Sequence, residues 1–307
     1  MTSPFGRLVL IANPKAGIGN AQAQLEQIGR ELDARGLEYR VALTTQRGDA
    51  GRLAREALQG GERFLVAVGG DGTIHEIVNG MVQDDQPVLP GAILGVIPAG
   101  SGCDFVKTFG LPEDTPRAVE HLDGGNTYTI DVGKITFIGD DGVETVRYFP
   151  NIAEAGLGGS VVERAERLPR RMGRSRYFFG FWFTLPGFKP VTVKVEAGPK
   201  SFEGRAHNVV VANGQYYGGG MRISPRSYPG DGFLDILVMK GPKSDAFTTI
   251  PKVYRGEHLP HKNMLEMKAK KVTVQTERPY RIEADGEVLG TTPATFEVIS
   301  HPIAVKI

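Results

Sequence analysis

Three short apolar runs in the first hundred residues each lead into a glycine-bearing loop and then into a helical pattern. The runs are Leu8 to Ala12, Phe64 to Val68 and Ile93 to Ile97. Uninterrupted apolar runs of this length are typical of parallel strands buried on both faces. The repeat therefore predicts right-handed β–α–β crossovers around a parallel sheet. We expect strands at 8–12, 39–43, 64–68 and 93–97, and helices at 21–35, 50–58, 73–81 and from 104 onward.

After about Ile130 the pattern changes to short β-rich runs separated by Gly, Pro and Asp turns. This pattern of short strands and turns predicts an antiparallel sandwich or barrel-like domain. We expect strands at 191–195, 208–212, 234–239, 272–276, 280–284 and 304–307, and helices at 161–171, 177–185 and 244–253. The predicted organisation is an α/β + β chain: an α/β domain over 1–130, with the tail 299–307 as a candidate to complete it, and a β-sandwich domain over 131–298.

Charge and cysteine content narrow the class of protein. Lys and Arg total 36 and Asp and Glu total 35, so the net charge is +1 and lacks the basic excess of a nucleic-acid binder. The single cysteine, Cys103, excludes an internal disulfide and fits a reducing compartment. The first residues lack a basic n-region, and the apolar run that follows is too short for a signal peptide or membrane span. We expect a cytoplasmic protein.

The loops that follow the three apolar runs carry the predicted chemistry. They are Asn13 to Gly17, Gly69 to Thr73 and Pro98 to Asp104. In a parallel sheet all three lie at the same edge, where ligands of open α/β sheets bind. Glycines and helix N-termini there favour phosphate oxygens, and carboxylates such as Asp71 and Asp104 suit Mg²⁺. We therefore predict a nucleotide triphosphate with Mg²⁺ at this edge.

Familiar nucleotide motifs are missing from the sequence. It contains no Gly-x-x-x-x-Gly-Lys-Ser/Thr, which excludes a P-loop enzyme. The run Gly156-Leu157-Gly158-Gly159-Ser160 lacks the full spacing of a dinucleotide fingerprint, and we interpret it as a turn.

Several motifs together point to one family. Asn13-Pro14-Lys15-Ala16-Gly17 matches an Asn-Pro-x-x-Gly loop, and Gly69 to Gly80 and Gly100 to Phe105 match two further loops. With these motifs the chain resembles the diacylglycerol kinase catalytic-domain family, which includes bacterial lipid kinases and the sphingosine and ceramide kinases. The resemblance extends over nearly the whole chain, through Gly218-Gly219-Gly220-Met221, Asp231-Gly232-Phe233-Leu234-Asp235 and Asp285-Gly286-Glu287.

The resemblance implies an ATP-binding α/β domain, a β-sandwich domain for the lipid substrate, and an active site in the cleft between the domains. It implies Glu287 as the proton acceptor, with Asp285 close by, because a primary alcohol must lose its proton as it attacks the γ-phosphorus. Asp285-Gly286 is also an ordinary type I′ hairpin turn. The residues implied to hold ATP and Mg²⁺ are Asn13, Pro14, Lys15, Ala16, Gly17, Thr44, Gly69, Gly70, Asp71, Gly72, Thr73, Ile74, His75, Ser101 and Asp104.

A second metal site follows from the resemblance to bacterial members. It places Mg²⁺ on the Asp231 carboxylate and on the backbone carbonyls of Tyr228 and Phe233. The alternative is a Pro-Gly-Asp-Gly turn between strands.

The sequence departs from the family at three positions. Cys103 stands where the family often has Asn, and Ser101 where Thr is common. A thiol is a weak hydrogen-bond partner, so Cys103 either alters base recognition or packs as a small hydrophobe. His75 replaces an Asn and is either a helix-start residue or a phosphate contact.

The segment Arg164 to Phe188 combines basic and aromatic residues, which suits an anionic membrane surface. The alternative is a core-facing helix with a solvated basic face. Exposed edges of the β-rich domain could also pair chains. The cluster comprises Arg164, Arg167, Arg170, Arg171, Arg174, Arg176, Tyr177, Phe178, Phe179, Phe181, Trp182, Phe183, Leu185 and Phe188.

The predicted function is an ATP-dependent lipid kinase that transfers the γ-phosphate to a hydroxyl of a lipid alcohol, either diacylglycerol-like or sphingoid/ceramide-like. Two alternatives stay open. One is a kinase of a soluble substrate such as NAD, and the other is a nucleotide- or lipid-binding protein without turnover.

Overall fold

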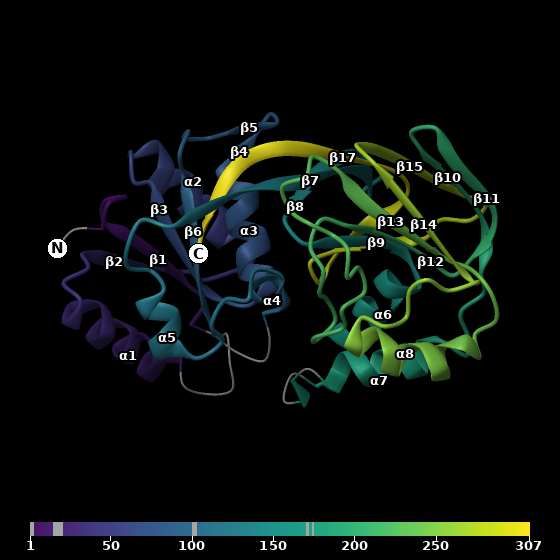
Figure 1. Cartoon of the computed structure of the whole chain (residues 1–307), viewed down its shortest axis with the longest axis horizontal. Coiled ribbons are helices and arrows are strands. Elements are labelled where there is room, and N and C mark those ends of the chain that lie inside the picture. Colours follow the sequence, from purple (N-terminus) through teal and green to yellow (C-terminus); the bar gives the residue numbers. More distant parts are fainter. Residues whose placement is uncertain (1–2, 15–20, 100–102, 170–171, 174) are drawn as a thin grey trace. The chain divides into compact units, whose positions relative to one another are not determined.

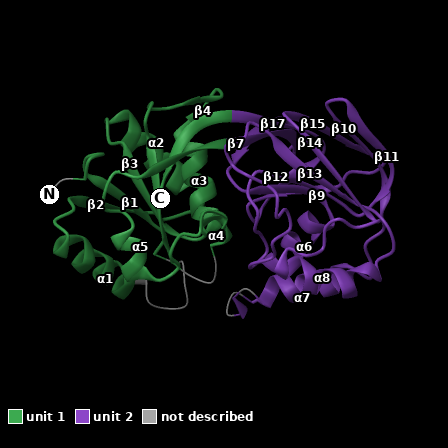
Figure 2. Cartoon of the chain, viewed as in Figure 1, with its two compact units in different colours: residues 1–131, 300–307 green, residues 132–299 purple. Residues whose placement is uncertain are grey.

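The computed structural model describes residues 3–14, 21–99, 103–169, 172–173 and 175–307. The chain divides into two compact units (Figures 1 and 2). Unit 1 comprises residues 1–131 and 300–307, and unit 2 comprises residues 132–299.

A parallel sheet forms the centre of unit 1 (Figure 1). Its order is β2-β1-β3-β6-β17, and each neighbouring pair is parallel. The last strand comes from the far end of the chain. The bounds are β1 (Leu8–Ala12), β2 (Tyr39–Leu43), β3 (Phe64–Gly69), β6 (Ile93–Pro98) and β17 (Glu287–Lys306), of which only the end of β17 belongs to this sheet.

Helices cover both faces of this sheet, as the alternation of strand and helix signals predicts. α1 and α5 pack on one face through a core that includes Ile28, Leu32 and Val119, together with alternate residues of β1 and β3. α2 and α3 pack against each other and against β1 and β3. The bounds are α1 (Ala21–Ala34), α2 (Asp49–Gln59), α3 (Asp71–Met81), α4 (Asp104–Phe109) and α5 (Thr115–Glu120), with a small hairpin of β4 (Val82–Gln83) and β5 (Gln86–Pro87).

Two glycines allow the close approach of α2 and α3. A Cβ on Gly51 would lie 2.7 Å from the Glu76 carbonyl oxygen, and a Cβ on Gly80 would overlap the Gly51 carbonyl. The helix that carries the central glycine motif is therefore held backbone to backbone against its neighbour.

Unit 2 is a sandwich of two antiparallel layers. One layer has the order β14-β13-β12-β9-β16-β17. In the other, β10 pairs with β11 and β15, β15 pairs with β17, and β7 pairs with β8 and β17. The bounds are β7 (Thr127–Gly139), β8 (Glu144–Phe149), β9 (Ile152–Gly156), β10 (Val191–Ala197), β11 (Lys200–Ala206), β12 (Asn208–Ala212), β13 (Leu234–Met239), β14 (Met264–Ala269), β15 (Lys271–Thr276) and β16 (Arg281–Ala284).

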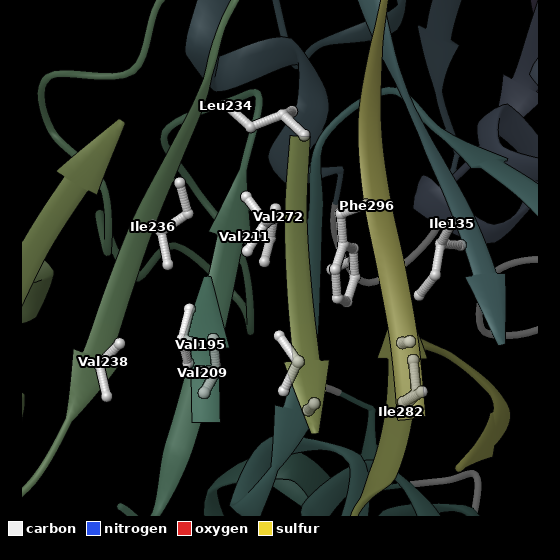
Figure 3. Packing of buried hydrophobic residues seen from close by; sticks show 14 of the residues in the cluster. Ile135, Val195, Val209, Val211, Leu234, Ile236, Val238, Val272, Ile282 and Phe296 are labelled. Carbon is white, nitrogen blue, oxygen red and sulfur yellow. The ribbon is translucent and has the colours of Figure 1, made fainter. Parts of the chain in front are cut away.

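The core of unit 2 lies between the two layers (Figure 3). Val195 and Val272 from one layer pack with Val209 and Ile236 from the other. β10 alternates strictly between buried and exposed residues, as expected for a strand with one face in the core. The predicted fold class, an α/β unit and an antiparallel sandwich, is confirmed.

Several predicted bounds need correction. The run Gly156 to Ser160 is not a turn: β9 ends at Gly156 and α6 (Leu157–Glu166) begins at the next residue. The strand expected at 304–307 is the end of β17, which starts at Glu287 and serves both units. The remaining helices, α7 (Ser175–Thr184) and α8 (Asp245–Arg255), lie within a few residues of prediction.

Candidate active site

The strand register of unit 1 brings the predicted loops together. Ala12 lies beside both Leu43 and Val68, and Gly69 lies beside Pro98. The residues that follow are tied across these strand ends: Thr44 N donates to Ala12 O at 2.9 Å, and Ala99 N donates to Gly69 O at 3.0 Å. The segments that start at Asn13, Thr44 and Gly69 therefore lie at one edge of the sheet.

The turn from Gly69 to Thr73 is a tight strand-to-helix junction. Thr73 N and Ile74 N both donate to Gly70 O, at 3.0 and 3.2 Å, which starts α3 at Asp71. A Cβ on Gly69 would overlap the Thr73 side chain, so this position requires glycine. Ile74 and His75 are buried on α3.

Asp71 connects two of the loops. Its Oδ2 accepts from Asp104 N at 2.9 Å and its Oδ1 accepts from Phe105 N at 3.0 Å, so it caps the first turn of α4. Asp104 is 4% exposed, and its Oδ1 accepts from Lys107 Nζ at 3.0 Å. Both predicted Mg²⁺ carboxylates thus also have structural partners.

Two further carboxylates order the start of α2 beside this edge. Glu76 accepts from Gly48 N at 2.9 Å and from Ala50 N at 3.1 Å. Asp49 accepts from Thr45 Oγ1 at 2.6 Å and Thr45 N at 2.8 Å. These hydrogen bonds, led by the Thr45 hydroxyl, hold the pKa of Asp49 far below its usual value.

Cys103 lies at the start of α4 and is 2% exposed, which agrees with packing as a small hydrophobe. Burial raises the pKa of its thiol well above the usual value, so the sulfur stays protonated and apolar. Among the predicted ATP contacts, Lys15, Ala16, Gly17 and Ser101 lie outside the described residues.

In unit 2 the Asp285-Gly286 turn closes the hairpin of β16 and β17. Ala284 lies opposite Glu287, and Asp285 and Gly286 have φ values of 50° and 85°, as a two-residue primed turn requires. Asp285 N donates to Ile152 O at 2.9 Å, and Asp285 Oδ1 accepts from Ile152 N at 3.0 Å. The turn is therefore fastened to β9, and Glu287 is half-buried at its exit.

Two buried glutamates lie behind this turn, and the sequence motifs do not include them. Glu283 Oε2 accepts from Gly286 N at 2.9 Å. Glu154 lies opposite Glu283 and accepts from Asn208 Nδ2 at 2.5 Å. The available signal was a single charged residue inside each apolar strand run, Ile152 to Ala155 and Ile282 to Ala284.

The loop proposed as a second metal site contains an ion pair. Asp231 Oδ1 accepts from Phe233 N at 3.0 Å, and Oδ2 accepts from Lys268 Nζ at 2.6 Å. Lys268 and Lys270 also lie over the Phe233 ring, at 5.9 and 5.5 Å. A Mg²⁺ ion on Asp231 would therefore have to displace an ammonium group. Within the described ranges, no group of three or more His, Cys, Asp or Glu side chains could hold a metal ion.

The aromatic segment forms an exposed surface on α7 and α8. Phe178, Phe183 and Phe247 are 51%, 58% and 66% exposed. The rings of Trp182 and Phe247 join the helices, with centroids 4.8 Å apart. Phe181 instead packs toward the core beside Trp182. Arg170, Arg171 and Arg174 lie outside the described residues, and none of the described helices is long and apolar enough to cross a membrane.

Comparison with known proteins agrees with this architecture. Residues 7–135 match the family model described as diacylglycerol kinase catalytic domain, and residues 151–307 match the YegS C-terminal NAD kinase beta sandwich-like domain. A diacylglycerol kinase of Bacillus subtilis is 30% identical over 94% of this chain and 92% of its own length.

Solved structures show the same fold. The structure of a diacylglycerol kinase from Bacillus anthracis has a TM-score of 0.74 and 26% identity, and the match covers 99% of this chain and 97% of that one. A yeast NADH kinase complexed with NADH has a TM-score of 0.50 and 11% identity, and covers 97% of this chain and 82% of that one. The second likeness is one of fold alone.

Proposed function

The chain belongs to the diacylglycerol kinase catalytic-domain family, and we propose that it transfers the γ-phosphate of ATP to a hydroxyl of a lipid alcohol. The observation that carries the proposal is the strand register of unit 1, which aligns the Asn13, Thr44 and Gly69 segments at one sheet edge. Backbone N–H groups at helix starts and glycines without side chains are the groups that hold a polyphosphate.

Glu287 is the proposed proton acceptor. Phosphoryl transfer needs little covalent help from the protein, so placing the acceptor hydroxyl and removing its proton are the main tasks of the sandwich unit. Asp285 is occupied by Ile152 N, which suits a residue that orients the turn more than one that accepts the proton.

Mg²⁺ would neutralise the phosphates, and its proposed ligands on the protein are Asp71 and Asp104. Each oxygen of an ionised carboxylate can accept more than one hydrogen bond or metal contact, so the helix-capping role of Asp71 leaves capacity for a cation. The second metal site, at Tyr228, Asp231 and Phe233, stays a prediction in competition with Lys268.

The acceptor is proposed to be a diacylglycerol-like lipid, since the relative from Bacillus subtilis carries that name. Sphingoid bases and ceramide are the other lipid acceptors to consider. Phosphorylation of NAD remains an alternative because of the shared fold with an NADH kinase, and binding without turnover is a third reading.

The test is ATP consumption by purified protein with Mg²⁺ against detergent-dispersed diacylglycerol, sphingosine and ceramide, with NAD as the soluble control. We expect phosphate transfer to one lipid and none to NAD. Turnover on NAD alone would replace the proposal with a soluble-substrate kinase. ATP binding without transfer to any acceptor would favour a binding protein.

The exposed face of α7 and α8 is the proposed membrane contact. A lipid acceptor resides in a bilayer, and exposed aromatic rings suit the interfacial region where apolar and polar layers meet. Arg167 and Arg255 are largely exposed in unit 2, but each pairs with a glutamate, Glu163 at 3.1 Å and Glu257 at 3.7 Å, so the proposal depends mainly on the aromatic rings.

Replacing Phe178 and Phe183 by Ser should weaken binding to vesicles of anionic phospholipid by about tenfold or more, because each buried ring contributes roughly 1.5–3 kcal/mol. Vesicle co-sedimentation measures the loss. The matched control replaces Val143 and Val146, which are exposed on the β7–β8 hairpin. Equal losses in both variants would remove the helical face as the contact.

A further inference from the structure

Two buried carboxyl groups lie directly behind the Asp285–Glu287 turn. Glu154 on β9 and Glu283 on β16 face each other in the ladder, and each residue is 2% exposed. Like charges placed directly opposite each other destabilise a sheet, and burial removes the water that would screen them. The two groups are compatible with this position when at least one of them holds a proton.

The surroundings of the two carboxyl groups differ. Glu154 accepts from Asn208 Nδ2, and Asn208 Oδ1 in turn accepts from Gly158 N at 3.3 Å. A Cβ on Gly158 would overlap the Glu154 carboxyl, so this group lies on the first turn of α6. A neutral donor and a helix N-terminus both favour the ionised form of Glu154. The proton therefore belongs mainly to Glu283.

Glu283 connects the pair to the turn. Its Oε2 accepts from Gly286 N, and its carboxyl also hydrogen-bonds the Glu154 carboxyl. The register between β16 and β17 shifts between Ile282 and Glu283, as in a β-bulge. Bulges redirect the side chains that follow them, and the next side chains here are those of the turn.

We infer that Glu154 and Glu283 share a proton as a positioning pair, in which the Glu283 carboxyl fixes the Gly286 amide and thereby the direction in which Glu287 is presented. The effect on turnover rests on the proposed kinase function. The shared proton and the fixed amide do not.

The titration of the pair follows from its burial. Desolvation raises the pKa of Glu283 well above its usual range and raises the pKa of Glu154 to about 7. Among the described residues, the other titratable groups that face the pair are a carboxyl and two phenols. They are Asp285 in the turn, Tyr217 between β12 and β13, and Tyr177 on α7, whose hydroxyl accepts from Arg176.

Variants at Glu283 separate positioning from mere packing. E283L removes the acceptor for Gly286 N, and we expect kcat to fall about tenfold to a hundredfold with KM for ATP unchanged. E283Q keeps an acceptor for Gly286 and gains a donor for Glu154, so it should restore most of the lost kcat. E283Q should also lack the loss of kcat that wild type shows at alkaline pH when the shared proton leaves.

Two measurements decide the inference without any turnover. Hydrogen exchange of the Gly286 amide should be slow in wild type and E283Q and much faster in E283L. Infrared spectra at neutral pH should contain a buried carboxylic-acid C=O band that E283Q removes.

Each outcome has a distinct meaning. If the acid band is absent from wild type, or if E283Q is as impaired as E283L in both kcat and amide exchange, the inference is overturned. If wild type phosphorylates no acceptor while the band and the protected amide are present, the proposed function fails and the positioning pair stands.

Discussion

Carboxylates order the loops of both units, but they do so in opposite electrostatic settings. In unit 1, Asp49 accepts from Thr45 N in the loop before α2, and Asp71 accepts from two backbone N–H groups at the start of α4. In unit 2, Glu154 and Glu283 face each other inside a sandwich layer. Hydrogen bonds lower the pKa of Asp49, whereas desolvation raises the pKa of Glu154 and Glu283.

The difference shows that a carboxylate's role depends on the donors around it. Loop and helix-start N–H groups, together with the helix dipole, can stabilise ionised carboxylates beside the glycine loops of unit 1. In unit 2 the backbone N–H groups of the strands donate to neighbouring strands. A buried glutamate there therefore needs a side-chain donor or must keep its proton. We expect unit 1 to be sensitive to acid and unit 2 to be sensitive to base.

The largest expected effect is on the unit 2 turn. E287Q removes the proposed proton acceptor while preserving size, so kcat should fall about a hundredfold to ten-thousandfold. ATP affinity should stay the same, because the variant leaves the loops of unit 1 intact. Steady-state kinetics and ATP titration calorimetry measure the two quantities.

The matched control for this variant is E297Q. Glu297 lies on the same strand and pairs only with the surface residue Lys271 in the contacts described, at 3.0 Å. We expect near-normal kcat in E297Q. A drop in kcat that is equal in the two variants would remove Glu287 as the base.

A smaller effect is expected for D71N in unit 1. The amide keeps one acceptor but points an NH₂ group at a backbone N–H of α4, so the cap should lose about 1–2 kcal/mol. The loop after β6 would loosen, and KM for ATP should rise about tenfold. Thermal unfolding and ATP titration measure these changes.

The control for D71N is D114N, because Asp114 caps a different helix, α5, through Arg117 N at 3.1 Å. It should lose comparable stability and leave KM for ATP unaltered. A normal KM for ATP in D71N would show that the cap does not order the nucleotide loops.

The opposite titrations predict opposite pH effects on stability. The glutamate pair binds more protons folded than unfolded, so its contribution to stability declines as pH rises from about 4.5, by roughly 1.4 kcal/mol per pH unit for each extra proton that the folded state retains. Asp49 has a lowered pKa in the folded state, so it stabilises the fold at pH values above the ordinary aspartate pKa of about 4. This contribution is lost as the pH falls below that value.

Thermal unfolding measured from about pH 3 to about pH 9 tests these opposite pH effects, because this range includes the titration of Asp49 and of the glutamate pair. E283Q should flatten the decline on the alkaline side, and D49N should flatten the decline on the acid side. If E283Q keeps the wild-type slope, the pair does not retain a proton in the folded state.

The smallest expected effect concerns Lys268. K268M frees one oxygen of Asp231, so added Mg²⁺ should raise the melting temperature of this variant more than that of wild type. The shift should be a few degrees at most, since an exposed ion pair contributes about 1 kcal/mol or less. An equal Mg²⁺ response in both proteins would show that Lys268 does not compete with a metal.

Local pattern alone was enough for the fold class and for most element positions. Apolar runs predicted the strands β1, β2, β3 and β6 almost to the residue, because strand burial and helix periodicity are properties of neighbouring residues. The glycine loops could be placed at one sheet edge for the same reason, since parallel strands leave their carboxyl ends together.

Other features depended on partners far away in the chain. The local pattern predicts a strand at 304–307, whereas β17 begins at Glu287 and continues to Lys306. The glycine run at 156–160 locally favours a turn, yet it starts α6, because its missing side chains make room for Glu154 and for the backbone of β16.

The buried glutamate pair is the clearest case of what only tertiary structure decides. Each residue alone is one charge in an apolar strand, and nothing local shows that Glu154 and Glu283 meet. Pairing between β9 and β16 sets them face to face and places Gly286 N on one of them. The sequence determined which residues make strands, loops and turns, and the tertiary structure decided which carboxylates meet donors and which meet each other.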